Sequence, residues 1–497
     1  MIWGNFLHFY QPSEQKPEVL EAIVNQCYRP MLKAVASSTN ARITANFSGC
    51  LLDLFDINGY HDLLDLIKNA ISSGTLELVG SAKYHALLPL LTKNDIYRQI
   101  VSNQDTLQFY LGRTVRISGF FPPEMAVDSK VLSVLNELSF KYVLLDEVSV
   151  QKTSELSSNV LFKDKISGLT ILPRHRRLSN LIMSSIVRNK TSFYDSVHEE
   201  ISTGGYYISA MDAETFGHHR PGLENLLFSL IKETKMYQQM NLSDICSQKF
   251  PLEFVNVFPS TWSSSREDLE QGIQFKSWQD PENSIHKLQH KLYFIARTEL
   301  SRLESSSVSK LSMRKARNKY DISLASDHYW WASAKPWWSV EMIELGANRF
   351  LDAIWATKPS KKIMTKAHSI YNRIIATAFD WQRSGKVSAY QKGKTTVRIP
   401  FKVRTLGAGG SEAGIYEAFI AMMRGLEKKA AAVGEYERAI LWRDAIYKIE
   451  KNLDIFDSIN AIDLVRNYIP NSKVEKILDK YTAKYKRIRS GQPEQRD

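Results

Sequence analysis

The first 260 residues alternate between short apolar runs and segments whose apolar residues recur at helical spacing. Leu63, Leu64, Ile67 and Ile71 illustrate the helical pattern, which ends at Gly74. Strands that alternate with helices favour a parallel sheet covered by helices, either open or closed into a barrel. The apolar runs predict strands at residues 2–10, 42–47, 76–79, 117–121, 142–145, 170–172, 206–211 and 254–258.

Polar residues stand at or just after the ends of several of these runs. They are His8, Glu77, Glu124, Asp146, Glu147 and Asp212. In a closed parallel barrel the carboxyl ends of the strands meet at one rim, where the following loops build the active site. Chance placement of carboxylates at strand ends would explain one or two of these positions, so the pattern favours a closed barrel.

The pattern becomes mostly helical after about residue 283. Residues 305–319 are rich in serine and basic residues and predict a mobile loop or hinge. Residues 385–402 predict a short hairpin, and residues 490–497 predict a disordered tail. We therefore predict a catalytic barrel at 1–282, a helical domain completing the active-site cleft at 283–380, a basic, mostly helical domain at 381–489, and the tail.

The net charge is unevenly distributed along the chain. The formal charge is +12, and residues 361–497 carry all of it, with 27 basic and 15 acidic side chains. The first 360 residues are formally neutral, which excludes a uniformly basic surface. Because no nucleic-acid motif accompanies the basic region, we interpret it as a solvated helical surface and expect no nucleic-acid partner.

Composition points to an ordinary globular protein, with 43% hydrophobic and 24% charged residues. No run of 18 apolar residues predicts a membrane span, and the first residues lack the features of a secretory signal. Cys27, Cys50 and Cys246 are too few and too scattered for a disulfide framework or a zinc cluster. We expect a cytoplasmic protein with no membrane partner, no metal and no cofactor.

The densest polar cluster of the chain lies at residues 211–222, directly after an apolar run. We interpret Asp212 as a catalytic carboxylate held by hydrogen bonds from histidine. Two alternatives stay open here. One is a polar loop that caps the next helix; the other is a metal site formed by Asp212, His218 and His219, since these ligand types suit zinc.

Glu124 follows an aromatic strand end and two prolines, which restrict the local backbone. Burial beside Phe120 and Phe121 would favour its neutral form unless hydrogen-bond donors compensate. A buried glutamate satisfied by backbone amides is the structural alternative. Two carboxylates from different strands on one rim are what glycoside hydrolysis requires.

Five ordered segments across residues 1–340 resemble glycoside hydrolase family 57. They are His8-Phe9-Tyr10-Gln11-Pro12, Gly74-Thr75-Leu76-Glu77-Leu78 with His85 downstream, the segment 119–126, the segment 211–218, and Ser326-Asp327-His328-Tyr329-Trp330-Trp331. The resemblance implies an α/β fold, a distorted TIM-like (β/α)7 barrel followed by a mostly helical C-terminal region. It also implies action on α-glucans or maltooligosaccharides, with Glu124 as nucleophile and Asp212 as general acid/base. Two positions differ from the family's usual pattern. Tyr10 stands where the family commonly has a second histidine, and Phe121-Pro122-Pro123 replaces the tryptophan-containing segment that usually precedes the nucleophile.

Further residues are expected to bind substrate, some from their motif and others because aromatic faces cover the apolar faces of glucose rings. Trp330, Trp331, Trp337 and Trp338 form such an aromatic group, and a cluster joining the barrel to the helices is the alternative. The predicted substrate-binding residues are His8, Gln11, Asn46, Glu77, His85, Glu214, His218, Trp262, Asp327, Trp330 and Trp331.

The function predicted from these residues is a retaining α-glucan hydrolase or transglycosylase. Water as acceptor gives an amylase, a glucan 4-hydroxyl a 4-α-glucanotransferase, and a 6-hydroxyl a branching enzyme. One alternative is a metal-dependent polysaccharide deacetylase or mannosidase-like enzyme with His8, Asp212 and His218 around zinc. Another is a catalytically idle glucan-binding scaffold.

The segment 430–446 resembles the short helical hairpin of the UvrB and UvrC repair proteins and of some protease adaptors. Such hairpins pair with other proteins through an apolar face. The resemblance implies a protein partner at the hairpin 425–452, and an ordinary amphipathic hairpin is the alternative.

Overall fold

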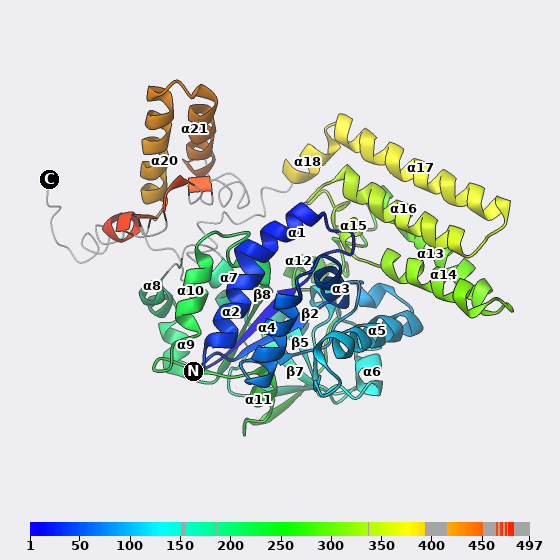
Figure 1. Cartoon of the computed structure of the whole chain (residues 1–497), viewed down its shortest axis with the longest axis horizontal. Coiled ribbons are helices and arrows are strands. Elements are labelled where there is room, and N and C mark those ends of the chain that lie inside the picture. Colours follow the sequence, from blue (N-terminus) through cyan, green and yellow to red (C-terminus); the bar gives the residue numbers. More distant parts are fainter. Residues whose placement is uncertain are drawn as a thin grey trace.

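A computed structural model of the 497-residue chain describes most of its length (Figure 1). The described residues are 1–150, 156–183, 187, 189–335, 337–392, 415–450, 464–465, 468–470, 473–474 and 476–481. The expected tail at 490–497 lies outside them. No helix in these ranges combines the length and the apolar character that crossing a membrane requires.

Seven parallel strands form a ring within the described ranges. The hydrogen-bonded order is β8-β1-β2-β3 on one side and β4-β5-β7-β8 on the other. A parallel bridge between Gly80 and Phe120 links β3 to β4 and completes the ring. The predicted (β/α)7 barrel is therefore confirmed. Its strands are β1 (Ile2–Phe9), β2 (Ile43–Phe47), β3 (Leu76–Leu78), β4 (Gly119–Phe120), β5 (Tyr142–Asp146), β7 (Thr170–Arg174) and β8 (Tyr206–Asp212).

Three further strands lie outside this ring. The eighth apolar run of the sequence contributes β10 (Leu252–Val255), which pairs with β6 (Leu161–Asp164) rather than with the barrel. Strand β6 in turn runs antiparallel to β7. The short β9 (Gln238–Gln239) pairs with the first residues of β1.

The barrel strands are buried on both faces, which explains why they read as continuous apolar runs. Helices cover the outside of the ring (Figure 1). They include α1 (Pro17–Ile23), α2 (Arg29–Ser37), α3 (Gly49–Ile57), α4 (His61–Ser72), α5 (Lys93–Leu111), α6 (Ser129–Glu137), α7 (Arg176–Met183), α8 (Lys190–Ser196), α9 (His198–Thr203) and α10 (Leu223–Leu230). Helix α11 (Leu242–Cys246) instead packs Leu242 and Ile245 against Phe6 and Ile208 of the strands, and α12 (Arg266–Glu270) follows the turn that carries Trp262.

A layer of helices extends to one side of the barrel (Figure 1). The expected mobile segment at 305–319 was wrong over most of its length, because Ser309 caps a helix that begins at Lys310. Serine favours the cap as well as the loop, so the sequence alone was ambiguous. The layer consists of α13 (Ser284–Glu304), α14 (Lys310–Ser323), α15 (Asp327–Trp330), α16 (Val340–Ala356), α17 (Lys361–Arg383) and α18 (Lys386–Lys392).

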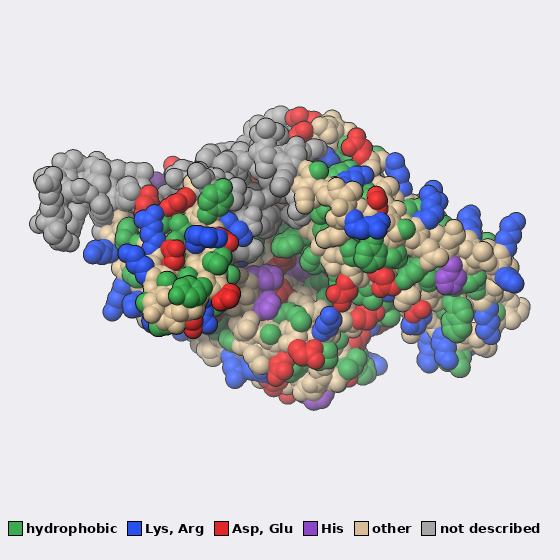
Figure 2. All heavy atoms as spheres, turned by 90° about the horizontal axis from the view of Figure 1, so that it is seen from above, with side chains coloured by type: hydrophobic (Ala, Val, Ile, Leu, Met, Phe, Trp, Pro, Cys, Tyr) green, Lys and Arg blue, Asp and Glu red, His purple; other side chains and the backbone are tan. Residues whose placement is uncertain are grey.

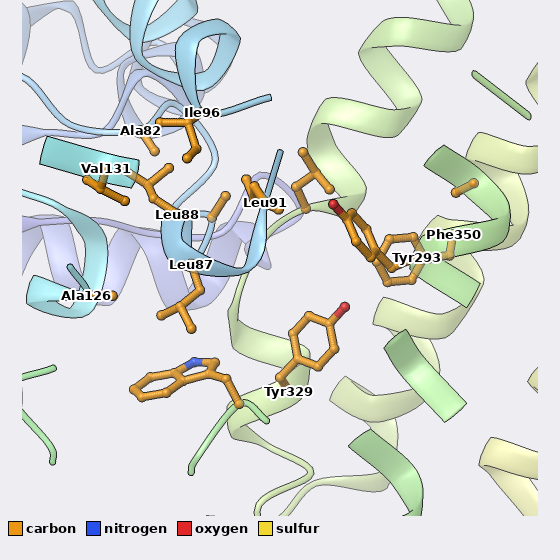
Figure 3. Close-up of a cluster of buried hydrophobic side chains, with 14 of the residues drawn as sticks. Ala82, Leu87, Leu88, Leu91, Ile96, Ala126, Val131, Tyr293, Tyr329 and Phe350 are labelled. Atoms are coloured by element: carbon orange, nitrogen blue, oxygen red, sulfur yellow. The ribbon is translucent and has the colours of Figure 1, made fainter. Parts of the chain in front are cut away.

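The barrel and the helical layer share one hydrophobic core. Leu87 and Leu88 follow β3, and their cluster includes Tyr293 of α13, Tyr329 of α15 and Phe350 of α16 (Figure 3). All five side chains are almost completely buried. Apolar burial of this extent fixes the helical layer against the loop that follows β3, which also carries His85.

The described C-terminal residues form a separate helical hairpin. Helices α20 (Ile415–Ala432) and α21 (Tyr436–Glu450) pack against each other, and Gly434 between them has a φ of 77°. Trp442 and Phe419 are buried in a hydrophobic cluster that belongs to this part of the chain. The predicted hairpin at 385–402 was wrong for its described part, because residues 386–392 are helical; the remainder lies outside the described ranges.

Candidate active site

Three neighbouring strands carry polar residues to the same level of the barrel. His8 of β1 pairs in register with Asn46 of β2 on one side and with Asp212 of β8 on the other. Residues in register on adjacent parallel strands point to the same face of the sheet. The three side chains therefore lie together near the carboxyl ends of the strands, as predicted.

The two histidines form a hydrogen-bonded pair that is linked at both ends. His8 Nδ1 lies 2.8 Å from Asn46 Oδ1, His8 Nε2 lies 3.1 Å from His85 Nε2, and His85 Nδ1 lies 3.1 Å from Ser326 Oγ. Because the Asn46 oxygen only accepts, His8 carries its proton on Nδ1, and His85 donates from Nε2. Burial lowers the pKa of His8 to about 4 and that of His85 well below its usual value, so both rings are neutral at pH 7.

Glu124 stands on a strained turn just after β4. Its φ is 60°, in the left-handed region that residues other than glycine rarely adopt, and Met125 follows with a φ of 50°. The indole N–H of Trp262 donates to Glu124 Oε2 over 2.7 Å, and the Trp262 backbone N–H donates to the Glu124 carbonyl over 3.1 Å. The other carboxylate oxygen lies 3.9 Å from His85 Nε2. The turn thus aims the carboxylate toward the histidine pair.

The carboxyl groups of Glu124 and Asp212 both have pKa values above those of ordinary carboxyl groups. Burial, followed by the charge of Asp212, raises the pKa of Glu124 to about 8, and the Trp262 hydrogen bond acts against this rise. Burial also raises the pKa of Asp212 to about 6, while the positive charge of Arg174 opposes it. The charge of Asp212 acts directly on Glu124, as expected for two carboxylates in one site.

Glu214, two residues after Asp212, points away from solvent into a polar pocket. Gln11 donates to its carboxylate over 3.0 Å, and the Tyr28 hydroxyl donates to the same oxygen. Burial and the charge of Asp212 raise the pKa of Glu214 to about 8. Glu214 and Gln11 therefore join the predicted group, and they bring in Tyr28, which the sequence did not single out.

Tyr10 occupies the position where the resemblance leads one to expect histidine. Its hydroxyl donates to Asp327 Oδ2 over 2.6 Å, and its ring stacks on His85 with 4.0 Å between the ring centroids. The charge of Asp327 also raises the pKa of Glu124, so the first residue of α15 contributes to the site. Tyr10 thus joins the helical layer to the barrel centre.

The tryptophans of the helical layer form a compact group. The rings of Trp330, Trp331 and Trp337 lie with centroids 5.4 to 5.8 Å apart. Trp330 and Trp331 are partly exposed, within about one helical turn of Asp327. Trp338 instead stacks on Trp381 of α17. Sugar contact by Trp330 and Trp331 stays a prediction, whereas Trp338 has a packing role.

Substrate contact by Trp262 stays a prediction, and the structure shows what its side chain touches in the free site. Its indole N–H is bonded to Glu124, and its ring packs near Phe121, with 5.9 Å between the ring centroids. The Arg174 guanidinium lies 5.9 Å from the centre of the Trp262 ring. Trp262 therefore holds the carboxylate of Glu124 in place.

Glu77 does not lie with this group. It pairs in register with Thr44, two residues before Asn46 along β2, and so lies about 7 Å nearer the amino ends of the strands. Its carboxylate accepts hydrogen bonds from the hydroxyls of Thr44 and Tyr142 at 2.8 and 2.9 Å. The expectation that Glu77 stands at the end of its strand was wrong, because β3 continues to Leu78.

His218 also lies apart from the carboxylates. Its Nδ1 is 2.7 Å from Gln26 Oε1 near the surface, so the expected hydrogen bond from histidine to Asp212 is absent among the described residues. No three His, Cys, Asp or Glu side chains within the described ranges form a group suited to a metal ion. His8, Asp212 and His218, the trio required by the zinc alternative, are thus not gathered into one donor set.

Sequence reasoning missed the arginines that follow β7. Arg174 and Arg176 both bind the buried Asp146, and Arg176 also contacts the turn that carries Trp262. Their position after the apolar run 170–172 could have revealed them, because His8 and Asp212 were singled out for standing at the ends of similar runs. Figure 2 shows a hollow on one face of the molecule, with histidine and acidic side chains in and beside it.

Comparisons with known proteins identify the family of this chain. A family profile described as glycosyl hydrolase family 57 matches residues 5–259. The 4-alpha-glucanotransferase of Thermococcus litoralis is 26% identical over 216 residues, which cover 42% of this chain and 32% of that protein. A putative alpha-amylase of Methanocaldococcus jannaschii is 22% identical over 310 residues, covering 57% of this chain and 65% of that protein. The chain thus spans less than two thirds of each of these relatives.

Solved structures show the same fold. The branching enzyme of Pyrococcus horikoshii superposes with a TM-score of 0.58 at 14% identity, covering 76% of this chain and 96% of that one. The glucanotransferase of T. litoralis gives a TM-score of 0.56 at 18% identity, covering 71% and 59%. Because the family profile matches just over half of the residues, the chain belongs to glycosyl hydrolase family 57.

Proposed function

We propose that this protein is a retaining glycoside hydrolase or transglycosylase that acts on α-1,4-glucans. Glu124 is the nucleophile and Asp212 is the general acid/base. The observation that carries the proposal is a pair of carboxyl groups, one just after β4 and one at the end of β8, each with a raised pKa and with the charge of Asp212 acting on Glu124. Glu124 faces His85, and Asp212 lies in register with His8. The family membership supports the same assignment.

In the first step, Glu124 attacks the anomeric carbon while Asp212 protonates the departing glycosidic oxygen. In the second step, Asp212 takes a proton from the acceptor hydroxyl, which displaces Glu124. This chemistry needs the pair to carry one proton, on Asp212, whereas the pKa values of the free site, about 8 for Glu124 and about 6 for Asp212, place that proton on Glu124. Glu124 has a pKa of about 8 in the free site, so groups that stabilise its ionised form are part of catalysis.

The surroundings supply substrate contacts mostly from uncharged side chains. The neutral His8 and His85, together with Asn46 and Asp327, offer hydrogen-bond donors and acceptors for the hydroxyls of one glucose ring. The side-chain nitrogen of Asn46 is buried and has no partner within the described structure, so it is free to donate to such a hydroxyl. Trp330 and Trp331 offer flat faces for the neighbouring sugar units.

The test is incubation with amylose, followed by analysis of the products. Shorter chains identify an amylase, redistributed chain lengths a 4-α-glucanotransferase, and new 1,6-linkages a branching enzyme. Glu124→Gln and Asp212→Asn should each lower kcat by at least about 10³-fold while the circular dichroism spectrum stays unchanged. Full activity in either variant would remove that residue from the mechanism.

A further inference from the structure

Arg176 is connected to Glu124 through one intervening residue, Trp262. The first link is Trp262, whose side-chain and backbone N–H groups both donate to Glu124. The side chain of Trp262 thus binds the Glu124 carboxylate, and the backbone of Trp262 binds the Glu124 carbonyl oxygen. The position of the indole depends on the turn at 261–264. The bridge between Ser260 and Val127 fixes the residue before this turn, and a second anchor holds the turn itself.

Arg176 provides that anchor from the start of α7. Its Nη2 donates to the carbonyl oxygens of Trp262 and Ser264 over 3.1 and 2.9 Å. Its Nε donates to Asp146 Oδ1 over 2.6 Å. One planar guanidinium therefore joins the tryptophan turn to a carboxylate at the end of β5.

The carboxylate that receives Arg176 is itself fixed. Asp146 is completely buried, and its second oxygen accepts from Arg174 Nη1 over 2.9 Å. Arg174 Nε donates to the carbonyl of Ala210, two residues before Asp212 in β8, over 2.8 Å. The network thus ties β5, β7 and β8 together.

We propose that Arg176 is a positioning residue that fixes the turn at 262–264 and thereby holds the Trp262 indole N–H against the Glu124 carboxylate. The inference rests on the proposed role of Glu124 and extends it. It assigns a function to a residue that contacts neither catalytic carboxylate.

The consequence concerns the ionisation of Glu124. The charged groups that face Glu124 are Asp212 and Asp327, which favour its protonated form, and His85 opposite is neutral. Arg176 itself faces Asp146 and Glu147. The Trp262 hydrogen bond is therefore the contact that favours ionised Glu124, and misplacing the indole should make the nucleophile harder to ionise.

The experiment compares Arg176→Met, Trp262→Phe and the double variant by the pH dependence of kcat/KM on maltooligosaccharides. Each single variant should move the rising limb of the profile upward by about one pH unit, since one hydrogen bond to a charged group is lost. The double variant should move it no further than Trp262→Phe alone. An unmoved limb in Arg176→Met would overturn the proposal, and so would additive shifts, which would mean that Arg176 acts directly through its charge.

Arg177→Met is the matched control, because the neighbouring Arg177 pairs with Glu200 and the Ser196 carbonyl instead. It should leave the limb in place. A second measurement needs no substrate: the pH dependence of Tm for each protein is compared with that of the same protein carrying Glu124→Gln, which isolates the titration of Glu124. If amylose is not a substrate, the proposed function fails, while an upward displacement of this titration in Arg176→Met still supports the positioning role; no displacement overturns it.

Discussion

Burial, more than any single hydrogen bond, determines the protonation of the residues in this site. It raises the pKa values of Glu124, Asp212 and Glu214 and lowers those of His8 and His85, in each case favouring the neutral form. A site built for an uncharged substrate benefits from this arrangement. Charge then develops mainly at the reacting carboxylates.

Glu214 gives this effect a measurable consequence for stability. Its pKa is about 8 in the folded protein and near its ordinary value of 4.5 when unfolded, so the folded state binds the proton more tightly. The resulting stabilisation is complete below pH 4.5 and is lost as the pH rises toward 8. Glu214→Gln should therefore gain a few degrees of Tm relative to the wild type between pH 5 and 8, measured by circular dichroism. A constant difference in Tm would contradict this.

Tyr10 offers a second test at the scale of one hydroxyl group. Tyr10→Phe keeps the ring that stacks on His85 but removes the donor to Asp327. We expect kcat/KM on maltooligosaccharides to fall about 10-fold, since a hydrogen bond to a carboxylate is lost. Tyr110→Phe is the control, because that hydroxyl donates to Asp56 on the surface. Equal effects in both variants would show that the Tyr10 bond is not specific to the site.

At the scale of elements, the sequence predicted where each strand lies along the chain better than which side chains meet in the folded protein. The barrel strands were recognisable because burial on both faces makes them uniformly apolar, and His8, Asn46 and Asp212 follow from their shared register. Glu77 misled because it lies inside its short strand, as the predicted run 76–79 already indicated, and not at the end of that strand. Contacts such as Arg176 with Trp262 span 86 residues and depend on the packed fold, so no local pattern reveals them.

The fit of α15 against α16 controls where Asp327 lies. Gly346 of α16 faces His328, and an added Cβ would come 2.1 Å from the ring. Gly346→Ala should displace α15, weaken the Tyr10–Asp327 contact, and lower Tm by several degrees, as overpacking costs about 1–3 kcal/mol. Gly425→Ala in α20 is the control, because nothing lies within 4 Å of its added Cβ. Calorimetry should show no loss of Tm there.

At the scale of the whole molecule, the described residues form four hydrophobic clusters, and the one in the C-terminal hairpin contains no residue of the barrel or the helical layer. The barrel and the helical layer share one hydrophobic cluster, so residues such as Asp327 and Ser326 reach the barrel centre from helices outside it. Helices α20 and α21 have a cluster of their own, and α21 also exposes Tyr436, Ile440 and Tyr447. A protein partner for this hairpin stays a prediction, and exposed apolar side chains at helical spacing are consistent with it.

Separate cores should respond separately to mutation. Trp442 is completely buried in the C-terminal cluster, and Trp442→Ala should destabilise that cluster by about 3–5 kcal/mol. Calorimetry should then show a C-terminal transition at lower temperature, an unchanged main transition, and amylose activity within about twofold of the wild type. Phe350→Ala, in the shared core, should instead lower the main transition and the activity together. Loss of activity in Trp442→Ala would mean that the C-terminal hairpin supports the active site, and the division into independent cores would fail.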